Sequence, residues 1–218
     1  MSKLTDKQAL ELWRRYNEGL AKDIDVDESL SRYDIDKKRA ELEADPIAWI
    51  LYFFPSYARY EFAPFHTKAI RRIIANDEWY EVLSWSRELA KSTVAMFVLM
   101  YLTLTKRKRF VALASPRGMR NEAIRPDIIY FDDYDTDEDC RNPVTLDKKW
   151  QWAEQALYPT RSISEPTLVL WCGNIIAKDC CITRAGKLAN NWDIVNIRDK
   201  HGRSAWPQKN TEEQIDRI

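Results

Sequence analysis

The chain has 218 residues, 45% of them hydrophobic, so it is long enough for one domain with a substantial core. Its 34 Lys and Arg residues balance 34 Asp and Glu residues, which excludes a protein that attracts nucleic acid through its overall charge. Its four cysteines lack metal-ligand spacing, its amino terminus turns polar before an export signal can form, and no apolar run reaches about 20 residues. We therefore expect reduced thiols, a cytoplasmic location and no membrane contact.

The first 44 residues predict a helical amino-terminal extension. Thr5 and Gln8 form a capping-box pattern ahead of apolar residues at helical spacing. An acidic, aperiodic stretch over residues 22–36 predicts a loop, and residues 37–44 predict a polar helix. Because Asp45 and Pro46 are suited to start a new helix, we place a domain boundary between residues 44 and 45 and assign residues 45–218 to the main domain.

The main domain begins with helices and then alternates between strands and helices. Apolar spacing predicts helices over residues 46–54 and 66–75. Strands are predicted over residues 79–85, 109–115, 127–132, 167–173 and 192–198, with helices over residues 91–105, after residue 143 and over residues 178–189. In the helix after residue 143, the expected buried residues are Leu146, Trp150, Ala153 and Leu157, with Trp152 outside this stripe. The alternation predicts an α/β fold with a parallel sheet flanked by helices.

A candidate phosphate-binding loop follows the first predicted strand and opens a helix. It comprises Ser86, Arg87, Glu88, Leu89, Ala90, Lys91, Ser92 and Thr93. In a P-loop, backbone N–H groups surround the phosphates, a Lys reaches their oxygens and a Ser or Thr hydroxyl holds Mg²⁺. Lys91 and Ser92 match those last two positions, whereas Trp85 and Ala90 replace the usual glycines. Taken alone, the segment is equally typical of a solvated first turn of a helix.

Two further strands end in polar residues that complete such a site. The strand over residues 127–132 ends in Asp132 and Asp133, the position of a Walker B motif, where the first carboxylate holds the Mg²⁺ shell and the second positions water. The strand over residues 167–173 leads to Asn174, which we expect near the hydrolytic water. Each strand end alone is also compatible with an ordinary turn. Together and in this order, they favour a P-loop NTPase of the ASCE/RecA-like kind.

At these residues the sequence resembles the large terminase subunit family of tailed bacteriophages. The resemblance includes an arginine inside a loop without glycines, here Arg87, and the approach to Asp132 and Asp133 through residues 115–127. It implies an ATP-hydrolysing, Mg²⁺-dependent motor domain in which Arg87 stabilises the transition state. It also implies that Phe65 and His66 receive the adenine, although a histidine beside a phenylalanine is equally typical of a residue that packs in the core.

The family resemblance further implies a set of partners and a location. The partners are double-stranded DNA that is moved into a procapsid, a small terminase subunit, a portal protein and other copies of the chain in a ring. The location is the host cytoplasm and, transiently, the procapsid portal. The basic run over residues 106–109 either contacts DNA phosphates or forms a solvated loop.

Two departures from the family limit the comparison. The family's carboxyl-terminal nuclease is absent from this sequence, so we expect no DNA cleavage by the chain. The predicted strands over residues 109–115 and 127–132 are joined by only residues 116–126, barely enough for a parallel crossover, which indicates an internal deletion. Two alternatives stay open: a helicase-like ATPase, and a truncated fragment that serves only as a nucleotide-binding or interaction module.

Overall fold

A computed structural model describes residue 11 and residues 14–15, 31–114, 125–161 and 164–217. The chain divides into two compact units, Met1–Glu41 and Leu42–Ile218. The division falls inside helix α2 (Arg32–Ala44), close to the boundary predicted from the sequence. Most of the first predicted helix lies outside the described residues. Apart from helix α2, the elements described here belong to the larger unit.

Helix α2 begins earlier than the sequence pattern predicted. The Ser31 hydroxyl accepts a hydrogen bond from the Asp34 amide at 3.2 Å and so caps the first turn. This local cap extends the helix over residues 32–36, so the prediction of a loop is wrong for these residues. The other described residue of the predicted loop is Ser31 itself, and residues 22–30 lie outside the described part of the chain.

The larger unit is built on one sheet of five parallel strands. The strands are β1 (Trp79–Trp85), β2 (Val111–Ala114), β3 (Ile128–Asp132), β4 (Leu168–Cys172) and β5 (Asn191–Val195). Their order across the sheet is β2-β3-β4-β1-β5, and every neighbouring pair is parallel. The predicted α/β class with a parallel sheet is therefore confirmed.

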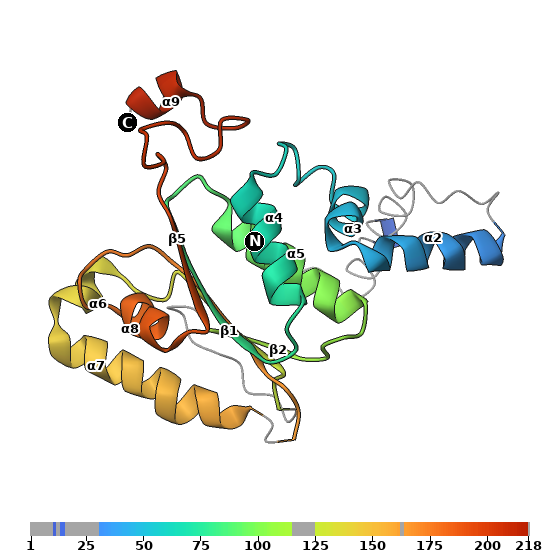
Figure 1. Ribbon diagram of the computed structural model, residues 1–218. Helices are drawn as coiled ribbons and strands as arrows, with labels where there is room; N and C mark the ends of the chain where they lie inside the picture. The colour runs from blue at the N-terminus through green and yellow to red at the C-terminus, as the bar shows by residue number, and fades with distance from the viewer. Residues whose placement is uncertain (1–10, 12–13, 16–30, 115–124, 162–163, 218) are drawn as a thin grey trace. The chain divides into compact units, whose positions relative to one another are not determined.

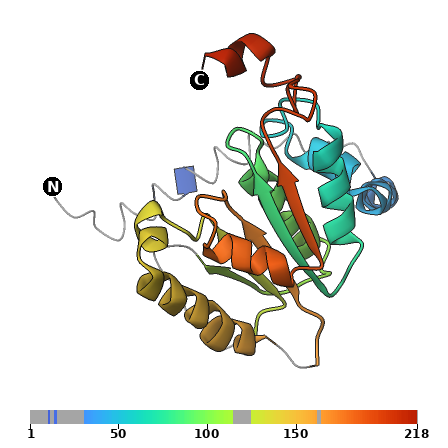
Figure 2. The same cartoon turned by 60° about the vertical axis from the view of Figure 1, so that its left-hand side comes forward.

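Helices cover both faces of the sheet (Figure 1; Figure 2). Along β1, Leu83 and Trp85 belong to a buried core that also contains residues of α3 (Pro46–Phe53), α4 (Pro64–Ile74) and α5 (Lys91–Leu104). Val82 faces the opposite side, where α7 (Pro143–Gln151), the π-helical turn η1 (Trp152–Leu157) and α8 (Cys181–Leu188) pack. Because successive strand residues point to opposite faces, continuous apolar strands give the sheet a core on each side.

Local signals account for several helix positions. Asp45 accepts a hydrogen bond from the Ile47 amide at 3.0 Å, which confirms it as the cap of α3. In α7 and η1 the predicted stripe is buried, since Leu146, Trp150, Ala153 and Leu157 are at most 9% exposed, whereas Trp152 is 37% exposed.

Three short elements, α6 (Asp137–Arg141), α9 (Glu212–Asp216) and the 3-10 turn η2 (Tyr158–Thr160), were not predicted. None of the described helices is both long and apolar enough to cross a membrane.

The chain between α5 and β3 contains two regions that the sequence left open. Strands β2 and β3 are hydrogen-bonded parallel neighbours. The inferred deletion near residues 116–126 lies largely outside the described residues.

In the basic run over residues 106–109, Lys108 is buried and its ammonium donates to the carbonyls of Asp77 at 2.8 Å and Pro166 at 2.7 Å. Lys108 therefore ties two loops together, and the interpretation of this run as a solvated loop is wrong for that residue.

Candidate functional site

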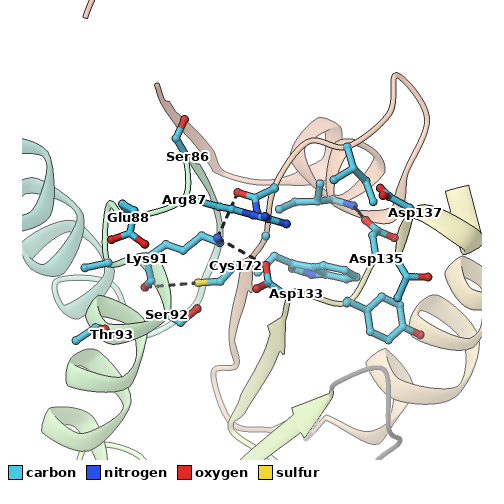
Figure 3. Close-up of a pocket in the computed structure, with 18 of the residues that line it drawn as sticks. Ser86, Arg87, Glu88, Lys91, Ser92, Thr93, Asp133, Asp135, Asp137 and Cys172 are labelled. Carbon is cyan, nitrogen blue, oxygen red and sulfur yellow. Dashed lines mark hydrogen bonds and ion pairs between the residues drawn. The ribbon is translucent and has the colours of Figure 1, made fainter. Parts of the chain in front are cut away.

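A polar cavity of about 690 Å³ lies at the carboxyl edge of the sheet (Figure 3). Its walls come from the loop after β1, the first turn of α5, the segments after β3 and β4, and Lys209. The chain leaves β1 through α5 toward β2, whereas it leaves the neighbouring β4 through α8 toward β5 on the other side of β1. Such divergent connections open a crevice between adjacent strand ends, which is where parallel α/β sheets bind ligands.

The loop after β1 has two residues in the left-handed backbone region, which is compatible with an anion-binding turn. Glu88 and Ala90 both have positive φ angles, 68° and 57°, although neither is glycine. Ala90 is also the N-cap residue of α5, directly before its first residue Lys91, and it offers no side-chain hydrogen bond to the first turn. The first-turn N–H groups of a helix lack acceptors within the helix, so they are free to bind a negative group at this end of the cavity.

Trp85, which replaces the first glycine of a usual P-loop, belongs to the strand and not to the turn. It is fully buried and packs edge-on against Phe65 at a centroid distance of 4.9 Å. The turn itself therefore begins at Ser86, whose amide donates to the Val195 carbonyl at 2.8 Å. The missing first glycine thus leaves the turn intact, because core packing holds that position in extended backbone.

His66 supports the loop from the protein interior. Its Nδ1 accepts from the Ala63 amide and its Nε2 donates to the Leu89 carbonyl, both at 3.0 Å. Burial lowers the pKa of His66 to about 4, so the ring is neutral at pH 7. Because a trans peptide points its C=O and N–H in opposite directions, this bond turns the Ala90 N–H away from His66.

These contacts favour the packing role over the adenine contact for the two residues. His66 is fully buried with both ring nitrogens engaged, and neither Phe65 nor His66 lines the cavity. The position of the two rings lends no support to direct contact with a base. Instead, His66 fixes the main chain of the loop.

Lys91 is the central cation of the cavity. Its ammonium donates to Asn174 Oδ1 at 3.3 Å and lies 3.6 Å from Asp133 Oδ1 (Figure 3). Its side chain is only 9% exposed, whereas that of Asp133 is 62% exposed. Three residues predicted from separate motifs, at the ends of β1, β3 and β4, are thus brought together around one ammonium group.

Ser92 and Asp132, the two residues predicted to hold Mg²⁺, contact each other; Ser92 lines the cavity, whereas Asp132 is not among its lining residues. The Ser92 hydroxyl donates to Asp132 Oδ1 at 2.8 Å. A hydroxyl and a carboxylate are the hard oxygen ligands that suit Mg²⁺, which usually takes one or two protein carboxylates and completes its shell with phosphate and water. Among the described residues there is no group of three or more His, Cys, Asp or Glu side chains that could hold a metal ion. The donor set therefore fits Mg²⁺ that arrives with a phosphate ligand.

The segments after β3 and β4 meet closely at the cavity. The Asp133 amide donates to the Cys172 carbonyl at 2.8 Å, and the Gly173 amide donates to the Leu83 carbonyl at 3.3 Å. A Cβ atom at Gly173 would lie 2.9 Å from Ile182 Cδ1 and 3.9 Å from Asp133 Oδ1. A side chain at position 173 would therefore require the end of the Ile182 side chain to move.

The remaining predicted residues take different positions. Arg87 and Thr93 line the cavity, and Arg87 is exposed without a charged partner among the described residues. Leu89 is fully buried and does not line the cavity. Arg87 is therefore free to turn toward a ligand, whereas Leu89 contributes only its backbone.

Sequence reasoning missed three charged residues at the site, Asp135, Asp137 and Lys209. Asp135 lines the cavity and accepts hydrogen bonds from the amides of Cys181 at 3.0 Å and Ile182 at 2.9 Å, which fixes the start of α8. Lys209 lines the cavity from a segment 121 residues away from the Glu88 to which it bonds. The acidic run after β3 gave a signal for Asp135, whereas nothing local marked Lys209.

The chain is thus an α/β protein with a cavity of cationic and acidic lining at the carboxyl edge of a parallel sheet. No protein-family model matches the chain, and no curated protein matches it. The assignment of its function therefore depends on the residues of the cavity.

Proposed function

We propose that the chain is a Mg²⁺-dependent ATPase of the P-loop class. The observation that carries the proposal is that Asp133 and Asn174 both lie against the Lys91 ammonium group. The hydrogen-bonded pair of Ser92 and Asp132 comes directly from the same two segments of the chain. Lys91, Asp133 and Asn174 follow three different strands, and their meeting at one cavity is what phosphoryl transfer requires of positioning and electrostatics.

Each group has a role that its position supports. The Lys91 ammonium and the first-turn amides of α5 bind the phosphates, and Arg87 stabilises charge that develops on the transferred group. Ser92 and Asp132 hold the ion, which when bound withdraws charge from the phosphate oxygens. Asp133 and Asn174 reach the same space and orient the attacking water.

Within that class we propose the ATPase domain of a large terminase subunit. The support is the loop without glycines that carries Arg87 and begins α5 at Lys91. The proposed activity is ATP-driven movement of double-stranded DNA into a procapsid. The proposed partners are a small terminase subunit, a portal protein and further copies of this chain in a ring, in the host cytoplasm and at the portal.

Phosphate release from Mg²⁺-ATP tests the ATPase proposal. We expect Lys91→Ala to lower turnover by roughly 10²- to 10³-fold, because one preorganised positive group is lost from the transition state. Lys187→Ala, at an exposed position on α8, is the matched control and should leave turnover unchanged. Equal turnover of the Lys91→Ala protein and the unaltered chain would remove the assignment.

Duplex DNA separates the terminase proposal from a general ATPase. A packaging motor should hydrolyse ATP faster when duplex DNA or its small-subunit partner is added. Turnover that neither addition changes would contradict the terminase assignment while leaving the ATPase assignment in place. Nucleotide binding without any turnover would instead favour an interaction module.

A further inference from the structure

The segment between β5 and α9 returns to the cavity and is firmly held there. Trp206 is 5% exposed, and its indole N–H donates to the Glu61 carbonyl at 2.8 Å. Its ring lies 4.5 Å from that of His66, the residue that holds the Leu89 carbonyl. The segment is thus packed on the same support as the loop after β1.

Lys209 extends from this segment to the loop. Its ammonium donates to the Glu88 carbonyl at 2.9 Å and to Glu88 Oε2 at 2.8 Å, and it lies 5.3 Å from the centre of the Trp206 ring. Asn210 contacts the same Glu88 carbonyl at 3.4 Å. Lys209 therefore adds a positive group to the cavity wall that also includes Arg87 and Lys91.

We propose that Lys209 is a phosphate-binding residue and that the Glu88 carboxylate occupies its ligand position until a nucleoside polyphosphate binds. The inference rests on the proposed function and adds a residue and a competition to it. On binding, the Lys209 ammonium passes from the Glu88 carboxylate to an outer phosphate of the nucleotide. Its bond to the Glu88 main-chain carbonyl keeps it beside the loop during the exchange.

The exposure of the pair favours this exchange over a purely structural role. The side chains of Lys209 and Glu88 are 24% and 64% exposed, and ion pairs open to solvent contribute little to stability. A polyphosphate carries more negative charge than one carboxylate and forms strong charge-assisted hydrogen bonds with an ammonium group. Glu88 lies in the loop after β1 itself, with a φ angle of 68°, so its carboxylate competes with the ligand for Lys209.

Binding measurements with Mg²⁺-ATP and AMP on single and double variants test the exchange. We expect Lys209→Met to weaken ATP binding by about tenfold and AMP binding by less than about twofold, because AMP lacks the outer phosphates. Glu88→Gln should tighten ATP binding by about threefold or more, since the competing anion is gone. In the Lys209→Met background, Glu88→Gln should have no effect, which shows that the two changes act through one contact.

Two further variants make the result specific. Lys209→Arg keeps the positive charge and should keep most of the ATP affinity, whereas Lys200→Met, at an exposed position of the same segment, should match the unaltered chain. Melting temperatures establish that each variant is folded. Unchanged ATP affinity in folded Lys209→Met, or weaker binding in Glu88→Gln, would overturn the proposal.

The Lys91→Ala variant distinguishes failure of this inference from failure of the proposed function. If Lys91→Ala loses ATP binding while Lys209→Met does not, only the role of Lys209 is rejected. If the unaltered chain binds no Mg²⁺-ATP, the ATPase assignment and the role of Lys209 are both rejected.

Discussion

The charged groups at the two ends of strand β1 differ in how completely they are hydrogen-bonded. Near its start, Glu81 is fully buried and accepts four hydrogen bonds, two from Arg72 at 2.5 and 3.1 Å, one from Trp79 at 2.7 Å and one from Asn191 at 2.8 Å. After its end, the Lys91 ammonium group has two long polar side-chain contacts within the described part of the chain, at 3.3 and 3.6 Å, and one of them is to a carboxylate that is 62% exposed. The first cluster is complete, whereas the second has room for a further negative group.

The number and length of its hydrogen bonds separate a structural charge from one that can bind a ligand. A buried carboxylate whose acceptor capacity is filled by protein donors stabilises the fold and offers nothing to a ligand. A nearly buried ammonium group with long contacts, beside a cavity, has lost water without gaining full replacement. We therefore read the Glu81 cluster as structural and the Lys91 cluster as the ligand site.

The largest predicted effect comes from neutralising the two carboxylates by matched amide substitutions. Glu81→Gln should lower the free energy of unfolding by about 3 kcal/mol or slightly more, because the largely buried Arg72 loses one of its two carboxylate partners and keeps only Asp193 among the described residues. Asp133→Asn should change it by less than about 0.5 kcal/mol, since Asp133 is exposed and Asn tolerates its positive φ. Urea denaturation measures both, and equal destabilisation would contradict the distinction between the clusters.

A smaller effect is expected from acid, through the His66 that supports the loop. Burial lowers the pKa of His66 from 6.5 to about 4, so the unfolded chain binds this proton more readily between those values. The stabilisation is therefore complete above about pH 6.5 and is lost as the pH falls toward 4, by up to about 3 kcal/mol.

Denaturation at a series of pH values checks this prediction. His66→Gln should flatten the dependence of unfolding free energy on pH between 6.5 and 4. His201, the other histidine, is exposed, so His201→Gln serves as the control and should keep the slope of the unaltered chain. A slope that His66→Gln leaves intact would assign the acid sensitivity to other groups.

The smallest predicted effect concerns the strained backbone of the ligand site. Ala90 has φ 57° and ψ 29°, a left-handed conformation that glycine adopts more easily. Ala90→Gly should relieve about 1 kcal/mol of strain but also increase the entropy of the unfolded chain, so that stability changes by less than about 1 kcal/mol. Thermal denaturation measures this change, and a loss above about 2 kcal/mol would show that the alanine methyl group is needed for packing.

Local patterns account for the parts of the fold that the sequence predicted correctly. The continuous apolar run of β1 and the residues that open α5 predicted both elements within one residue of their observed ends. Asp45 predicted the start of α3 because its side chain acts on an amide only two residues away. Asp132 and Asp133 were predictable as strand-end acids, since a strand and its final residues are local features.

The misses depend on contacts between distant segments or on an overlooked cap. Lys209 reaches the cavity only because Trp206 packs on His66, a relation that no local pattern encodes. The sequence left both an adenine contact and a packing role open for His66, because its sequence neighbours do not show that both ring nitrogens bond inside the protein. The start of α2 was missed although Ser31 and Asp34 provided a local signal.

The strand order has a consequence for how the site tolerates change. Strand β4 lies between β1 and β3, so the segments that follow β1 and β3 are held apart by two backbone spacings, about 10 Å. Main-chain hydrogen bonds set this separation, and side chains on the two faces of the sheet do not. Substitutions in either apolar core should therefore alter stability well before they alter the gap across which Lys91 and Asp133 face each other.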